Sequence, residues 1–108
     1  MMMEKVFAVV VALTTSAILA VATDPLKHTF KPEAGYVPDA NTAVAIAVAV
    51  WNPIYGKETI EAERPYKAML SNGVWTVVGT LPKRMVGGVV MAEISKDDGR
   101  ILRVTHGK

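Results

Sequence analysis

The fold is decided by residues 66–81, which read Tyr-Lys-Ala-Met-Leu-Ser-Asn-Gly-Val-Trp-Thr-Val-Val-Gly-Thr-Leu. Two runs that are typical of strands, 66–70 and 74–81, flank Ser71-Asn-Gly73. An Asn-Gly pair between such runs is a strong hairpin signal. Gly79 lies inside the second run, where a glycine indicates a bulge or a helix that crosses closely. The stretch therefore predicts an antiparallel hairpin.

A second hairpin is predicted downstream. Residues 89–95 and 100–106 flank Lys96-Asp-Asp-Gly99, and Gly99 can adopt the positive φ that a bulge after a type I turn requires. Residues 82–88, which join the two hairpins, are numerous enough for a protruding loop. Alternation along the four strands predicts that Glu93 and Arg103 pair on the outer face. The core face is predicted to carry Trp75, Val77, Gly79, Leu81, Val90, Ala92, Ile94, Leu102 and Val104.

A helix is predicted to begin after Asp39. The run 42–51 alternates Ala with Val or Ile, which a strand would also satisfy, but its Ala content, its length and the capping carboxylate of Asp39 favour a helix. Asn52-Pro53 and Tyr55-Gly56 should end or kink it. Because it is apolar nearly all round, we expect it to be covered on more than one side. One helical stripe contains Ala43, Ile46, Ala47, Val50 and Ile54.

These elements predict an α+β fold, with one apolar helix packed on a curved antiparallel sheet of about four strands. Ahead of it, residues 6–22 carry no charge and end in Ala20-Val-Ala22, which is typical of a signal peptide with its cleavage site. We therefore expect residues 1–22 to be a signal peptide, 23–38 a proline-rich extended lead-in, and 39–108 the folded domain. The alternative is an uncleaved membrane anchor, since a run of 17 uncharged residues reaches the short limit of a spanning helix.

Composition excludes several classes of function. A net charge of +2, from 12 Lys+Arg and 10 Asp+Glu, is low for a protein that tracks nucleic-acid phosphates, so no nucleic-acid partner is expected. The absence of cysteine excludes disulfides, thiolate zinc sites and a cysteine nucleophile. If the N-terminal segment is a signal peptide, the mature protein acts in the periplasm. It would contact a membrane only if that segment were retained.

The folded part resembles the bacterial NTF2-fold immunity family from about Phe30 to the C-terminus. The resemblance is carried by Gly35-Tyr-Val-Pro-Asp39, Trp51-Asn-Pro-Ile-Tyr-Gly56, Arg64-Pro-Tyr66, Trp75-Thr-Val-Val-Gly-Thr-Leu-Pro82, Gly87-Gly88, Asp98-Gly99 and Thr105-His-Gly107. It implies a reduced NTF2-like or cystatin-like cone, in which a helix lies on a curved sheet, and a partner that is a cognate toxin protein. The Ala-Val-rich helix departs from this resemblance, because relatives carry more charge there.

His106 is the one residue that merits a test for catalysis. Strand parity places it on the face of Leu102 and Val104, toward the concave side of the sheet. No second titratable residue is expected to orient it, so a hydrogen bond to backbone at the end of the sheet is the favoured interpretation. The charged segment 57–64 is expected to be a solvated loop or helical turn. Because His28 lies in the lead-in and no His and carboxylates have metal-ligand spacing, no metal, cofactor or catalytic residue is predicted.

The favoured function is that of a non-enzymatic, exported immunity protein that occludes its toxin. Lys83, Arg84 and Met85 form a mixed cationic and apolar tip of the 82–88 loop, and Tyr66 begins a strand beside a charged segment. These four residues are the predicted toxin contacts. Two alternatives stay open: a periplasmic small-ligand binder or minor enzyme that uses a pocket around His106, and an envelope protein held by its uncleaved N-terminal helix.

Overall fold

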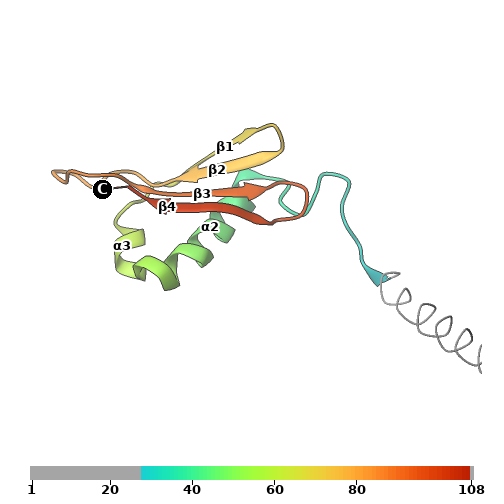
Figure 1. Cartoon of the computed structure of the whole chain (residues 1–108), viewed down its shortest axis with the longest axis horizontal. Coiled ribbons are helices and arrows are strands. Elements are labelled where there is room, and N and C mark those ends of the chain that lie inside the picture. Colours follow the sequence, from blue (N-terminus) through green and yellow to red (C-terminus); the bar gives the residue numbers. More distant parts are fainter. Residues whose placement is uncertain (1–27, 108) are drawn as a thin grey trace, which may run out of the picture. The chain divides into compact units, whose positions relative to one another are not determined.

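A computed structural model describes residues 28–107 (Figure 1). The predicted signal peptide and the first part of the predicted lead-in lie outside the described residues. Within residues 28–107, no helix is both long enough and apolar enough to cross a membrane. The chain from Lys31 onward forms a single compact unit, and the elements below belong to it.

Helix α2 (Ala40–Tyr55) begins where the sequence predicted it. The Asp39 carboxylate accepts hydrogen bonds from the Thr42 amide, at 2.8 Å, and from the Thr42 hydroxyl, at 2.7 Å. This side chain satisfies an amide that has no partner within the helix. At the other end Gly56 adopts a φ of 97°, and its N–H donates to the carbonyl of Asn52. The cap residues therefore set both ends of the helix.

The buried stripe of α2 consists of Ala43, Ala47 and Trp51, which follow one another at intervals of four residues. The prediction that Ile54 belongs to the buried stripe is wrong, since its side chain is 56% exposed. Trp51 is fully buried in its place and donates from its indole N–H to the Met91 carbonyl. Within residues 28–107, the sheet lies against one face of the helix (Figure 1), and Val44, Ile46 and Val48 beside the buried stripe are partly buried.

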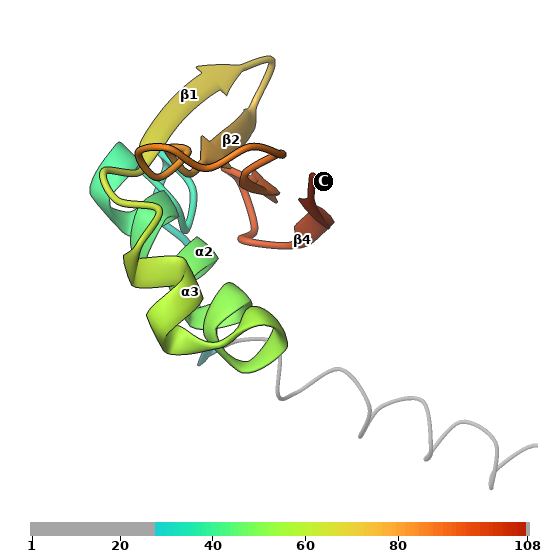
Figure 2. The same ribbon diagram turned by 90° about the vertical axis from the view of Figure 1, so that its left-hand side faces the viewer.

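Four antiparallel strands form the sheet in the order β1-β2-β3-β4. Their bounds are β1 (Lys67–Ser71), β2 (Val74–Val78), β3 (Val90–Ser95) and β4 (Ile101–His106). Figure 2 shows the sheet curving from β1 at one edge to β4 at the other. Both hairpins, the strand order and the α+β class are as the sequence predicted. The core between helix and sheet contains Val37, Ala43, Ala47, Trp51, Ile60, Trp75, Val77, Val90, Ala92 and Ile94.

Two residues predicted on the core face are exposed. Leu81 follows the end of β2 at Val78, so it lies outside the regular alternation. Leu102 is 43% exposed because β4 has a bulge: Arg103 pairs with Glu93, as predicted, while Ile101 pairs with Ile94. Leu102 is thus the extra residue of the bulge and has no partner on β3. The bulge interrupts the alternation of faces from which Leu102 was predicted to face the core.

The second half of the lead-in packs on the sheet. The amides of Tyr36 and Val37 donate to the carbonyls of Asp97 and Lys96 in the turn between β3 and β4. Val37 is fully buried, and its carbonyl accepts a hydrogen bond from the Trp75 indole at 2.8 Å. These bonds join the chain before α2 to the sheet beneath it.

Candidate functional site

The site begins with Glu63, which lies two residues beyond the end of the short helix α3 (Lys57–Glu61). The Ile60 side chain of α3 is buried against the core, and the Glu63 amide donates to the Ile60 carbonyl. This geometry turns Glu63 inward, and only 3% of it is exposed. The segment 57–64 includes the predicted helical turn. The expectation that this segment is solvated is wrong at Ile60 and Glu63, which are both buried.

Each carboxylate oxygen of Glu63 has a partner. Oε1 accepts from the backbone N–H of Val90 at 2.8 Å, and Oε2 lies 2.8 Å from Nε2 of His106. Gly79 makes room for this carboxylate, because a Cβ at that position would lie 2.7 Å from Oε1. The sequence predicted a bulge or a crossing helix at Gly79, whereas the group that approaches it is the Glu63 side chain, from the turn after α3.

His106 lies at the end of β4 with both ring nitrogens engaged. Nδ1 lies 2.8 Å from the carbonyl oxygen of Gly107, and Nε2 faces Glu63. Both partners are acceptors, so both nitrogens donate only when the ring is a protonated imidazolium. The hydrogen bond to Gly107 and then that to Glu63 raise the pKa of His106, against the opposing effect of burial. The Tyr55 ring packs beside the imidazole at 5.2 Å between centroids.

The expectation that no titratable residue orients His106 is wrong. Glu63 does so from 43 positions earlier in the chain, a separation at which sequence spacing is uninformative. Gly79 was the signal available in the sequence, because it marks a close approach without naming the approaching group. The pairing restrains the imidazole and occupies both of its ring nitrogens with acceptors.

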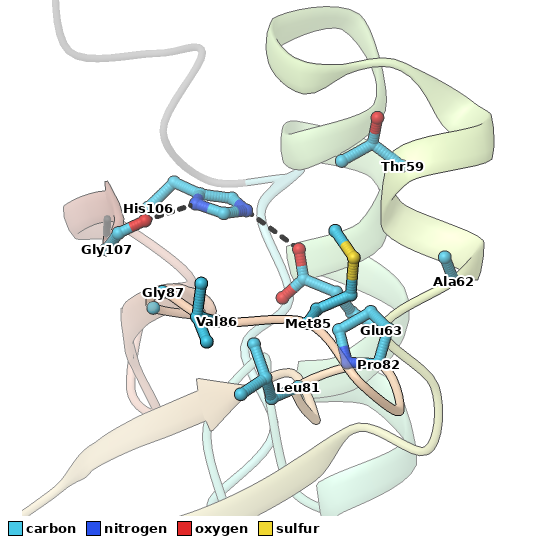
Figure 3. Close-up of a pocket in the computed structure, with 11 residues that line it drawn as sticks. Thr59, Ala62, Glu63, Leu81, Pro82, Met85, Val86, Gly87, His106 and Gly107 are labelled. Carbon is cyan, nitrogen blue, oxygen red and sulfur yellow. Dashed lines mark hydrogen bonds and ion pairs between the residues drawn. The ribbon is translucent and has the colours of Figure 1, made fainter.

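A cavity of about 330 Å³ lies beside this pair (Figure 3). Its two sides are the end of α3 and the loop 82–88, and its walls are mostly apolar side chains. Met85 and Val86 of the loop are 58% and 95% exposed, so the cavity is open to solvent at the loop. The cavity is lined by Thr59, Ala62, Glu63, Leu81, Pro82, Met85, Val86, Gly87, Gly88, His106 and Gly107. Within the described range 28–107, His, Asp and Glu side chains form no group of three suited to a metal ion.

The loop begins with a tight turn. The Met85 amide donates to the Pro82 carbonyl at 3.1 Å, and Arg84 has a φ of 65°. A positive φ at the third residue of such a turn is typical of type II geometry, which favours Gly or Asn there. Arginine takes this position instead, and the side chains of Lys83 and Arg84 are both exposed.

The structure brings together three of the four predicted toxin contacts, since Lys83, Arg84 and Met85 share the loop. Tyr66 lies elsewhere: it is half-buried, its ring packs on Trp51 at 5.7 Å, and its hydroxyl donates to the Ile60 carbonyl at 2.7 Å. Burial raises the pKa of the Tyr66 phenol. Tyr66 thus stabilises α3 from the edge of the core, and it is not among the residues that line the cavity.

The helix-on-sheet fold and the sequence of residues 42–108 match the family of NTF2 fold immunity proteins, and the chain belongs to this family. It is 42% identical over 72 residues to the uncharacterized protein YhhH of Escherichia coli K12, an alignment that covers 63% of this chain and 56% of that relative. It is 38% identical over 55 residues to the uncharacterized protein YbbC of the same organism, covering 50% of this chain and 45% of YbbC. The chain therefore spans about half the length of these relatives. No solved structure matches it.

Proposed function

We propose that this protein is an exported immunity protein that binds a cognate toxin and neutralises it by occlusion. The observation that carries the proposal is the match of residues 42–108 to NTF2 fold immunity proteins. The partner is accordingly a toxin protein, and the chemistry of the interaction belongs to that partner. No cofactor is required for a mechanism in which one protein covers the working surface of another.

The geometry of the ion pair supports occlusion over catalysis. The strongest acid–base candidate among the described residues is His106, and both of its ring nitrogens already have acceptors. A general base needs a free nitrogen within hydrogen-bond reach of its substrate. The exposed residues Lys83, Arg84, Met85 and Val86 combine charge with apolar surface, as residues of protein interfaces do.

Export is supported by the sequence of the N-terminal segment, where an uncharged run ends in Ala20-Val-Ala22. On this proposal the protein meets its toxin in the periplasm, after removal of residues 1–22. An envelope protein held by the uncleaved segment is the corresponding alternative, and N-terminal sequencing of the recovered protein separates the two.

A second candidate function is suggested by the cavity. Its volume of about 330 Å³ lies at the lower end of the range for small-molecule sites. A periplasmic binder of a small apolar ligand would use the same walls, with the pair of Glu63 and His106 as a fixed polar floor. On this reading a ligand from a periplasmic extract would copurify with the protein, and protection against a toxin would be absent.

The test is protection of bacterial cells that express a candidate toxin, sought first among the genes beside this one. The toxin is directed either to the periplasm or to the cytoplasm, and the protein is supplied as the full chain or as a version that begins at Thr23. We expect protection from the periplasmic toxin by the full chain alone. Protection from the periplasmic toxin by the version without residues 1–22 would contradict export, and loss of protection in every arm would contradict immunity.

A further inference from the structure

We propose that the cavity between α3 and the loop 82–88 receives one apolar side chain of the toxin, and that Lys83 and Arg84 bind carboxylates on either side of that anchor. This inference rests on the proposed function and names the chemistry of the partner. The anchor is a large aliphatic or aromatic side chain, and the surrounding segment of the toxin is acidic.

The size and walls of the cavity fit an apolar anchor. A volume of about 330 Å³ accommodates a large side chain but lies near the lower end for drug-sized ligands. Leu81, Pro82, Met85 and Val86 supply the apolar wall on the loop side, and Ala62 supplies a small residue opposite (Figure 3). A shallow cavity ringed by apolar side chains is the form that binding anchors occupy at protein interfaces.

The floor of the cavity offers little to a polar ligand. Both oxygens of Glu63 and both nitrogens of His106 are already hydrogen-bonded. A polar group inserted there would have to break one of these bonds or remain without a partner, at a desolvation cost. An apolar group carries no such requirement, because the paired charges of the floor need no further ligand.

The exposed apolar side chains of the loop also favour an apolar partner. Val86 is 95% exposed and Met85 is 58% exposed, so apolar surface beside the cavity faces water in the free protein. A partner that covers both side chains removes this surface from water, which favours association.

The charges around the cavity differ between its two sides. The loop carries Lys83 and Arg84, and neither side chain has an ion pair or hydrogen bond within the part of the chain that the structure describes. Helix α3 carries Glu58 and Glu61, and Glu61 lies 4.0 Å from Lys57. Because Lys57 of α3 offsets one of these two acids, the helix side is only weakly acidic, and carboxylates of the partner are favoured on the loop side.

The backbone of Arg84 is an independent observation. Its φ of 65° is one that glycine adopts readily and that side-chain-bearing residues rarely adopt. This position, which is suited to glycine, is taken by an exposed arginine that follows Lys83 directly. Residues whose backbone conformation is unfavourable for their type cluster at functional sites.

The test uses the full chain and blocked tripeptides as probes. Backbone amide shifts are followed by NMR during titration with acetyl-Glu-Phe-Glu-amide, acetyl-Lys-Phe-Lys-amide and acetyl-Glu-Gly-Glu-amide. We expect saturable shifts at Ala62, at residues 85–88 and at Gly107 with the first peptide. The lysine peptide should bind about fivefold more weakly, as two exposed ion pairs imply, and the glycine peptide should not bind. Absence of saturation, or shifts centred elsewhere, overturns the inference.

Three variants complete the experiment. Ala62→Trp fills the cavity from the exposed end of α3 and should abolish binding of the phenylalanine peptide. The double reversal Lys83→Glu, Arg84→Glu should exchange the preference between the glutamate and lysine peptides. The matched control Lys67→Glu, Arg100→Glu changes the net charge equally at exposed positions outside the loop, and it should leave the preference unchanged. An equal response to both double reversals contradicts the proposed role of the loop.

The two proposals fail separately. If Ala62→Trp still neutralises the toxin with wild-type affinity, the cavity is not the anchor site, while the immunity proposal stands. If the wild-type protein binds the glutamate peptide at the cavity but does not protect cells from the neighbouring toxin, the immunity proposal fails and the cavity binds another acidic segment.

Discussion

Nε2 of His106 lies 2.8 Å from Oε2 of Glu63, and this contact joins the last residue of β4 to the segment that follows α3. The same carboxylate holds the first residue of β3 through the Val90 amide. Glu63 thus connects three parts of the chain at the point where the loop 82–88 leaves and returns to the sheet. The side chains that frame the cavity depend on this connection for their positions.

Replacement of Glu63 tests that connection. Glu63→Ala should destabilise the protein by about 2 kcal/mol, because it leaves the Val90 amide and the His106 ring without their acceptor. Glu63→Gln should cost less, since its amide oxygen can still accept from Val90. Urea unfolding of both variants measures the difference. Equal stability of Glu63→Ala and the wild type would contradict the structural role of the pair.

The raised pKa of His106 predicts the direction of a pH effect on stability. The folded protein binds the proton more tightly than the unfolded chain, whose histidine has a pKa near 6.5. The stabilisation is therefore complete below about pH 6.5 and is lost as the pH rises through the pKa of the folded state. Thermal melting of the wild type and of His106→Gln from pH 5 to 9 isolates this contribution. A wild-type advantage that grew with rising pH would contradict it.

Gly79 is predicted to be intolerant of even one additional carbon. The Cβ of Gly79→Ala would lie 2.7 Å from Oε1 and 3.0 Å from Cβ of Glu63, so the carboxylate would have to move. We expect a loss of about 1–3 kcal/mol from this overpacking. The loss should be smaller when Gly79→Ala is combined with Glu63→Ala, because the clash is then relieved. Strict additivity in urea unfolding would show that the two residues do not interact.

Two aspartate substitutions separate the buried face of the sheet from the bulge. Val77→Asp places a charge where the side chain is fully buried, and a cost of several kcal/mol should prevent folding. Leu102→Asp should melt close to the wild type, because the bulge leaves Leu102 in contact with solvent. Circular dichroism melting compares them. Unfolding of the Leu102 variant would mean that β4 lacks the bulge.

Local patterns were sufficient to predict most of the fold. The Asp39 cap, the Asn-Gly turn and the alternation within β2 and β3 each act over a few residues, and each element was found near its predicted position. Leu102 was misplaced because a bulge changes the alternation without changing residue type. Glu63 was missed because its partners, Gly79, Val90 and His106, come from distant positions that only the tertiary structure brings together.

In the candidate site, too, the contiguous residues could be predicted from the sequence and the contacts between distant residues could not. The loop residues Lys83, Arg84 and Met85 are contiguous, so composition alone indicated a mixed cationic and apolar tip. The cavity beneath that loop depends on α3 and β4 meeting at one end of the sheet, which no periodicity encodes. Tyr66 was read as exposed because it borders a charged segment, yet its hydroxyl reaches the carbonyl of Ile60.

The central claim is that the protein acts by covering its toxin and performs no chemistry. The most direct measurement is the activity of the purified toxin as a function of the ratio of this protein to toxin. The wild type and a folded Glu63→Gln, His106→Gln variant are compared under conditions of tight binding. Occlusion predicts that inhibition rises linearly and is complete at one protein per toxin for both. Complete inhibition by far less than one equivalent of the wild type, together with loss of inhibition in the variant, would contradict occlusion and assign catalysis to the pair.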